Sequence, residues 1–575
     1  MKLFVIAAVA YFFCLQFVFP GYFHPLVPHH DDFYFPPGLS YDGHSLAEKL
    51  QWPRPLGFLA MEVLGKLGLK GYLFVLVTVT LGNAALTMAL ARRIFGQPIS
   101  WFPALVYCIL LFAHPDFYVD YLHDAFGTLS YFYLILAMHA WYNYRETNQA
   151  RWPVICAVLL LAIGFTKETY FVSALVFWLV QIYLCRGAQR RMSVLLLAGS
   201  CVFFAAGLAA NAYSMKNFLH LKTNITSPYH VSLAPAAVVH GFWFYASRLF
   251  HPAVLALAVG GIAVLYHKRE QMIMACALVV AGVCALLPYS VLPNHLDSMY
   301  AWTGAALVFS PVLFFSRPFN GQEIWRTVAV YAGVAALVFL SVRTSRAQYD
   351  EHRWNIAQEQ VNRNIIDSYP ALKGLDGSVR RVLVTGLDMP FQPFHTPSYI
   401  RSEFGAEREW TVLIPEGAST AKSEASVRSC PPSAVRLSDY DVAIGFASDG
   451  GLLRQWSRAQ LLEPSTREQT DRILFPALNP IFDALAKDPG NWEALLRGGV
   501  VYFKWGELDT AANYLQRSAE LSHHQNPYPM FFLGQVHEAQ GKFTEARGYY
   551  SEAVALDPGR TNPAFWAALE RVREK

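Results

Sequence analysis

Long apolar segments alternate with short polar loops over the first 342 residues of the chain and then stop. A helix that crosses a bilayer needs roughly 17–25 mostly apolar residues, and by this criterion, relaxed where aromatic residues or prolines blur a boundary, the pattern predicts about eleven spans. They cover residues 3–19, 72–91, 99–113, 125–142, 152–166, 169–185, 192–213, 253–266, 272–289, 301–315 and 327–342. We therefore expect a mainly α-helical, polytopic membrane domain over residues 1–342.

The pattern changes character after residue 342, where charged residues recur regularly. Residues 343–367 are polar and predict a linker helix. Two short apolar runs that contain a late glycine, at 379–386 and 441–446, predict buried strands. A small α/β domain over residues 368–465 follows from them. Its glycines do not form a phosphate-binding fingerprint, so we predict no nucleotide there.

Residues 476–575 have a helical pattern that repeats itself. The recurring residues are Trp492, Gly499, Tyr502, Gly506, Ala511, Tyr514, Ala519 and Leu521, then Phe532, Gly534, His537, Gly541, Ala546, Tyr550, Ala553 and Leu556. Gly506 and Gly541 are about one period apart, as in stacked helix-turn-helix units. This stretch resembles tetratricopeptide repeats. Its apolar positions belong to the core, so only the polar concave face is free to bind a partner.

The composition agrees with a membrane protein that carries an aqueous part. Of the 575 residues, 54% are hydrophobic and 15% are charged. A net charge of +4 is small for this length and argues against a nucleic-acid partner. The cysteines show neither a metal-binding spacing nor a disulfide framework. We interpret residues 1–19 as an uncleaved signal-anchor helix.

Pairs of cations, such as Arg92-Arg93 and Lys268-Arg269, fall on alternate loops, which predicts that these loops are cytoplasmic. The N-terminus then lies in the cytoplasm, and the intervening polar loops and the C-terminal half share the outer side. Because the chain shows no eukaryotic targeting signal, we expect a bacterial inner membrane with the C-terminal domains in the periplasm.

The first outer loop carries two adjacent carboxylates, Asp31 and Asp32, preceded by two histidines and followed at a distance by Arg54. Paired carboxylates at a membrane surface are costly unless something uses them. A base and a phosphate-binding cation beside a lipid-facing cavity would use them. The alternative is an acidic, solvated loop without chemistry.

Three further outer segments are polar. The second outer loop interleaves His114, Asp116, Asp120 and Asp124 with aromatic residues, which suits sugar faces and hydroxyls better than a metal, although a structural loop is the alternative. Lys167 and Glu168 adjoin at the end of a span, where they either neutralise each other or bind a phosphate. The late loop, 293–300, carries His295 and Tyr300.

In this order, the acidic doublet, the second acidic loop opened by His114-Pro115, the Lys167-Glu168 pair and the tyrosine-containing late loop resemble the GT-C superfamily of integral-membrane glycosyltransferases. The resemblance is to the branch that carries C-terminal tetratricopeptide repeats. It implies a polyprenyl-phosphate-sugar donor, a protein or glycan acceptor and contact with membrane lipid.

The resemblance also implies roles for single residues. Asp31 would be the general base and Asp32 would orient it. Relatives carry an arginine in the late loop that this chain lacks, so the candidates for binding the donor phosphate are Arg54, Lys167, Arg248 and His295.

Glu168 would hold Lys167 in place. The supporting and acceptor-binding candidates are His114, Asp116, Asp120, Asp124, Glu168 and Tyr300. A monophosphate donor demands neither a metal nor a cofactor. Two other functions stay open: a transporter or flippase of a lipid-linked or polymeric substrate, and a non-catalytic scaffold that presents the repeats.

Overall fold

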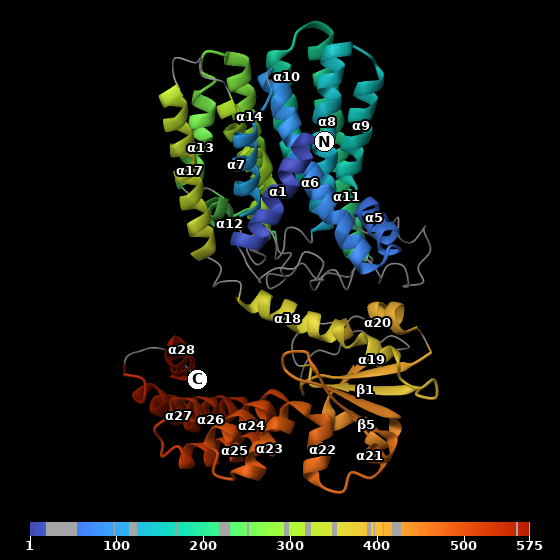
Figure 1. Cartoon of the computed structure of the whole chain (residues 1–575), viewed down its shortest axis with the longest axis vertical. Coiled ribbons are helices and arrows are strands. Elements are labelled where there is room, and N and C mark those ends of the chain that lie inside the picture. The colour runs from blue at the N-terminus through green and yellow to red at the C-terminus, as the bar shows by residue number, and fades with distance from the viewer. Residues whose placement is uncertain are drawn as a thin grey trace. The chain divides into compact units, whose positions relative to one another are not determined.

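The computed structural model describes most of the chain. The described residues are 1–18, 54–96, 98–113, 124–167, 169–217, 231–249, 252–292, 298–316, 324–347, 353–387, 393–395, 397–405, 407–416, 427–558 and 562–573. The contacts divide the chain into two compact units, Met1–Ala357 and Gln358–Lys575. Figure 1 labels the elements of both units.

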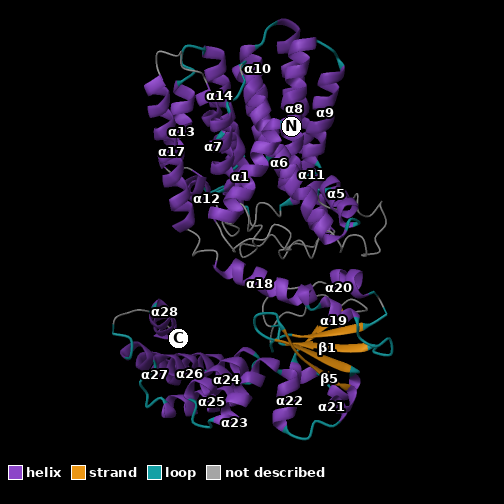
Figure 2. Cartoon of the chain, in the orientation of Figure 1, coloured by secondary structure: helices purple, strands orange, loops and turns teal. Residues whose placement is uncertain are grey.

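The first unit is a bundle of apolar helices, and no strand occurs in its described part (Figure 2). Its longer helices are α1 (Lys2–Phe13), α5 (Pro55–Gly65), α6 (Gly68–Phe95), α7 (Trp101–Phe112), α8 (Ala125–Thr147), α9 (Arg151–Gly164), α10 (Tyr170–Leu184), α11 (Gly187–Asn217), α12 (Pro235–Leu249), α13 (Pro252–Ala263), α14 (Arg269–Cys284) and α17 (Ile324–Ala347). Helix α8 packs on α6 and α9, and α10 packs on α11 and α14. One continuous core results.

Three helical stretches in the described chain are long and apolar enough to cross a membrane: Lys70–Phe95, Gly187–Ala210 and Arg269–Ser290. The bent pair α12 and α13 adds a fourth if it forms one span, and seven other apolar helices are shorter than this test requires. The first unit is thus consistent with a membrane domain. The expected number of about eleven spans is not confirmed.

The segment 301–315, expected to be a span, forms an apolar helical stretch that is not a regular α-helix. It contains 3₁₀ turns at Ser298–Gly304 and Ser310–Ser316 around the single α-turn α16 (Ala305–Val308). Pro311 has no backbone N–H and cannot continue an α-helical ladder. Gly304 also packs directly on α14, where an added Cβ would lie 1.9 Å from the carbonyl oxygen of Gly282. Backbone contact this close favours turns that fit the neighbouring helix.

The region 214–252, expected to be a loop, contains helix α12. Tyr245 of this helix is fully buried, while Trp243 is exposed. A buried residue and an exposed residue two positions apart are typical of an amphipathic helix. A window that averages hydropathy along the chain does not detect such a helix.

The second unit opens with α18 (Arg353–Asp367), which crosses the contact boundary, and carries a five-stranded sheet in the order β3-β2-β1-β4-β5 (Figure 2). The strands are β1 (Arg381–Thr385), β2 (Glu409–Leu413), β3 (Val427–Cys430), β4 (Val442–Phe446) and β5 (Leu452–Ser457). All pair in parallel except β5. The two strands predicted from the sequence are β1 and β4, at the centre of the sheet. Their near-continuous burial is typical of parallel strands covered on both faces.

Asp441, at the start of β4, accepts backbone N–H groups of Arg380 and Arg381 at 2.8 and 3.0 Å and pairs with Arg458. These N–H groups, and then the Arg458 cation, hold the pKa of Asp441 below its usual range. Because the folded-state pKa is lowered, the stabilisation is complete above the unfolded-state pKa, about 3.9, and is lost as the pH falls through the folded-state value.

We expect Asp441→Asn to reduce the acid sensitivity of the sheet. Hydrogen exchange of the β1 amides in the full chain, compared at neutral pH and below about pH 4, measures it. Glu407→Gln is the matched control, since Glu407 is an exposed carboxylate 3.8 Å from Arg380. If hydrogen exchange of the β1 amides depends on pH in Asp441→Asn as it does in the wild type, Asp441 is not the source of the acid sensitivity.

The C-terminal part of the second unit consists of stacked helices. They are α22 (Arg467–Leu474), α23 (Asn479–Lys487), α24 (Trp492–Lys504), α25 (Leu508–Leu521), α26 (Pro527–Ala539), α27 (Phe543–Ala555) and α28 (Pro563–Arg573). Helix α24 packs on α25, and α26 packs on α27. Gly506 and Gly541 sit at the turns of these two pairs with φ of 80° and 76°, a conformation that favours glycine. The two recurring glycines thus mark equivalent turns.

Gly534 of α26 lets the second helix pair close. A Cβ there would lie 2.5 Å from the ring of Tyr550, which is fully buried and donates to Glu538 at 2.8 Å. We expect Gly534→Ala to destabilise this pair by about 1–3 kcal/mol, because the tethered ring cannot move away freely. Hydrogen exchange of α26 and α27 in the full chain measures the effect. Gly548→Ala is the control: it has open space and improves helix propensity by up to about 1 kcal/mol.

Candidate active site

Lys167 and Asp124 form a nearly dry ion pair at one end of the first unit. Lys167 lies just after α9, where its N–H donates to the carbonyl of Ile163 at 2.9 Å. Its Nζ is within hydrogen-bond distance of Oδ2 of Asp124, and the two side chains are 5% and 9% exposed. Charges this deeply buried persist only when each compensates the other.

Two tyrosine rings complete the surroundings of Lys167. Tyr289 and Tyr300 stack with ring centroids 3.9 Å apart, and the Nζ of Lys167 lies 5.5 and 5.1 Å from these centroids. A cation at this distance is attracted by the ring quadrupole when it lies over the ring face. We call Lys167, Asp124, Tyr289 and Tyr300 the Lys167 cluster. Segments far apart in the sequence meet in it.

The carboxylate of Asp124 is fixed from two sides. One oxygen accepts the N–H of Gly127 at 2.9 Å, so Asp124 is the N-cap of α8, and the other oxygen faces Lys167. Gly127 has no side chain to interfere, whereas a Cβ there would lie 2.3 Å from Oδ2. The orientation of Asp124 is therefore set by the helix start itself.

Arg54 adjoins the same region through the backbone. It is the N-cap of α5 with φ of 57°, and the next residues dock that helix, since Leu56 N–H donates to the carbonyl of Phe165 at 3.0 Å. Its guanidinium carbon lies 6.0 Å from the ring centroid of Phe126, two residues beyond Asp124. A second cation thus borders the segments that carry the Lys167 cluster.

Of the residues predicted from the sequence, the structure brings together Asp124, Lys167 and Tyr300, with Arg54 on an adjoining element. Arg248 lies on α12, where its guanidinium carbon is 3.8 Å from the ring centroid of Phe244. No described contact joins it to Lys167. Seven predicted residues lie outside the described chain: Asp31, Asp32, His114, Asp116, Asp120, Glu168 and His295.

Sequence reasoning missed three contributors. Tyr289 stacks on Tyr300, its hydroxyl donates to Oγ1 of Thr169 at 3.4 Å, and Tyr245 of α12 packs against both tyrosine rings at 6.2 and 6.5 Å. The one signal for Tyr289 in the sequence was its place at the end of the predicted span 272–289, shortly before the late loop. Among the described residues no group of three or more histidine, cysteine or carboxylate side chains is placed to hold a metal ion.

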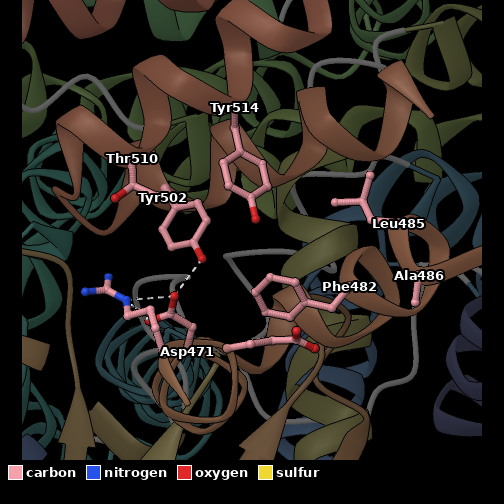
Figure 3. A pocket seen from close by; sticks show the side chains of 9 residues that line it. Asp471, Phe482, Leu485, Ala486, Tyr502, Thr510 and Tyr514 are labelled. Carbon is pink, nitrogen blue, oxygen red and sulfur yellow. Dashed lines mark hydrogen bonds and ion pairs between the residues drawn. The ribbon is translucent and has the colours of Figure 1, made fainter. Parts of the chain in front are cut away.

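The second unit contains a separate pocket of about 600 Å³, shown in Figure 3. Asp471 is buried in its wall, where it accepts the hydroxyl of Tyr502 at 2.8 Å and pairs with Arg467. Burial, and then the Asp471 charge, raise the pKa of Tyr502, so this hydroxyl stays a donor. Glu468 is likewise paired, with Arg472. Both carboxylates are compensated within the fold, so we interpret them as a structural network.

Comparison with known proteins gives limited matches. The tetratricopeptide repeat family model matches residues 527–560, which confirms the predicted repeats over that stretch. No curated protein matches the chain. The chain is similar to the crystal structure of the Archaeoglobus fulgidus oligosaccharyltransferase in the apo form, with 11% identity and a TM-score of 0.36 over 70% of this chain and 63% of that one. It thus spans less than two thirds of that protein's length. A likeness of this size carries no argument about activity.

Proposed function

We propose that this chain is a membrane glycosyltransferase that transfers a monosaccharide from a polyprenyl-phosphate donor to a hydroxyl of a protein or glycan. The observation that carries the proposal is the buried Lys167 cluster. Lys167 has three N–H donors, and the one hydrogen bond of its ammonium to a described residue goes to Asp124, so this cation can offer further donors to a phosphate. The two tyrosine rings beside it offer apolar faces of the kind that bind sugars. In the sequence, the second outer loop ends at Asp124, and Glu168 directly follows Lys167.

The proposed reaction is a single displacement that inverts the anomeric centre. The acceptor oxygen attacks the anomeric carbon while the carboxylate of Asp31 takes the hydroxyl proton, and Asp32 orients this base. The bond from the anomeric carbon to the phosphate oxygen breaks, and the electron pair leaves with the polyprenyl phosphate. Lys167 and Arg54 stabilise the charge that develops on that phosphate. We place this site on the outer, periplasmic side of a bacterial inner membrane.

A transporter or flippase is the competing function, because buried charges in a helical bundle also mark substrate paths. The full chain in proteoliposomes, supplied with labelled sugars on polyprenyl phosphate and with candidate acceptors, separates the two. We expect label in the acceptor and one polyprenyl phosphate released per sugar transferred. NMR of the product should show that the anomeric configuration is inverted relative to the donor. Liposomes without protein are the control. Donor that crosses the bilayer intact, with no labelled product, would identify a flippase instead.

A further inference from the structure

A pocket of about 320 Å³ opens at the opposite end of the bundle from the Lys167 cluster. It is lined by residues of α6, α8, α10 and α14, and its charged members are Arg93, Arg145, Glu146 and Glu270. Helix α8 connects the two ends: it starts after Asp124 and carries Arg145 in its last turn. At 1.5 Å per residue these two residues are roughly 30 Å apart, about the thickness of a hydrocarbon layer. We call this second cavity the headgroup pocket.

The position of the headgroup pocket selects lipid as the class of ligand. Two of the three helical stretches that are long and apolar enough to span a membrane end at it, Lys70–Phe95 with its C-terminus and Arg269–Ser290 with its N-terminus. The end of a spanning helix lies at the level of the lipid headgroups. Apolar side chains of Ile94, Leu184 and Met274 continue the lining. They suit the glycerol and the first methylenes of an acyl chain.

Among the described residues, the two arginines of the headgroup pocket contact a backbone carbonyl and an aromatic ring. Arg93 donates to the backbone carbonyl of His139 at 3.1 Å, and the guanidinium carbon of Arg145 lies 5.5 Å from the ring centroid of Tyr142. In the part of the chain that the structure describes, no ion pair joins either arginine to a carboxylate, although Glu146 and Glu270 line the same cavity. Arginines without a carboxylate partner are well suited to a phosphate, which they bind in bidentate fashion.

The charges that line the headgroup pocket indicate which class of lipid headgroup fits it. Two guanidinium groups and two carboxylates add up to no net charge, so the complementary ligand is a zwitterion with one phosphate and one N–H-bearing cation. We propose that the headgroup pocket binds phosphatidylethanolamine, with its phosphate on Arg93 and Arg145 and its ammonium on Glu146 and Glu270. Phosphatidylglycerol would leave both carboxylates without a cation, and the choline group has no N–H to donate.

The test uses the purified full chain in detergent, titrated with short-chain phosphatidylethanolamine, phosphatidylglycerol or phosphatidylcholine, with bound lipid counted by native mass spectrometry. We expect one phosphatidylethanolamine to be retained in preference to the other two. Arg93→Gln with Arg145→Gln should lower its affinity at least about tenfold, because charge-assisted hydrogen bonds to the phosphate are lost. Glu146→Gln with Glu270→Gln should abolish the preference over phosphatidylglycerol.

Arg151→Gln is the matched control, because Arg151 is an exposed cation at the same end of the bundle that does not line the pocket. It should bind lipid as the wild type does, and circular dichroism checks that every variant is folded. Equal retention of the three lipids by the wild type, or arginine variants that bind normally, would overturn the proposal. The proposal rests on no step of sugar transfer, so its failure would leave the proposed activity untouched.

Discussion

Lys167→Met is expected to lower sugar transfer by at least about 100-fold, the usual effect of removing one group that stabilises charge in a transition state. The substitution keeps most of the length of the unbranched side chain and removes the cation that is proposed to face the donor phosphate. It should also destabilise the bundle by about 3–5 kcal/mol, because Asp124 is left buried without its cation. Initial rates with labelled polyprenyl-phosphate sugar and the thermal midpoint of the full chain in detergent measure the two effects.

The double variant Asp124→Leu with Lys167→Met separates stability from chemistry. Replacing both members of a buried ion pair by apolar residues is often neutral for stability, whereas losing one member is not. We therefore expect the double variant to regain most of the stability that Lys167→Met loses and to remain inactive. It should stay below the wild type by about 1 kcal/mol, because Asp124→Leu also removes the N-cap of α8. A double variant that transfers sugar at the wild-type rate would show that the pair is only structural, and Lys167 would be withdrawn as a phosphate-binding residue.

Asp31→Asn is expected to lower transfer by about 10²–10⁴-fold, the range for losing a general base. Asparagine has nearly the same shape but cannot accept the acceptor proton, so donor binding should persist while turnover is lost. Single-turnover kinetics of the full chain measure the loss of turnover, and binding of the labelled donor measures whether donor affinity persists. Asp32→Asn is the matched control at the neighbouring carboxylate, with a smaller expected loss because Asp32 only orients the base.

Three outcomes would contradict these roles. If Asp32→Asn loses more turnover than Asp31→Asn, the base is Asp32. If both variants transfer sugar normally while Lys167→Met does not, the base lies elsewhere and the acidic doublet is a solvated surface loop. Loss of donor binding in Asp31→Asn would instead assign the doublet to substrate binding.

The buried ion pair also explains how a cation can be kept at a membrane boundary. Lys167 lies between apolar helices, where a lone ammonium group would be strongly disfavoured. Asp124 and the stacked tyrosines lower that cost and leave part of the ammonium available. In the proposed reaction, the donor phosphate would share a cation already held in place, which is the preorganisation that electrostatic catalysis requires.

Much of the architecture was readable from the sequence because it is encoded locally. The strands β1 and β4 are short apolar runs bounded by polar residues. The two repeated helix pairs are indicated by Gly506 and Gly541, which lie at equivalent turns. Long apolar stretches likewise predicted a helical bundle. The same reasoning selected Lys167, Asp124 and Tyr300 as polar residues at unusual positions. It also paired Lys167 with its neighbour Glu168, which lies outside the described residues.

Only the tertiary structure pairs Lys167 with Asp124, 43 residues earlier, and stacks Tyr289 on Tyr300 beside them. It also replaces a regular α-helix at 301–315 by 3₁₀ turns around a short α-turn, where Gly304 meets Gly282 of α14. Hydropathy and spacing report each residue's relation to its near neighbours in the chain. Contacts between separate helices depend instead on how whole faces pack, and a single backbone approach or buried charge can decide them.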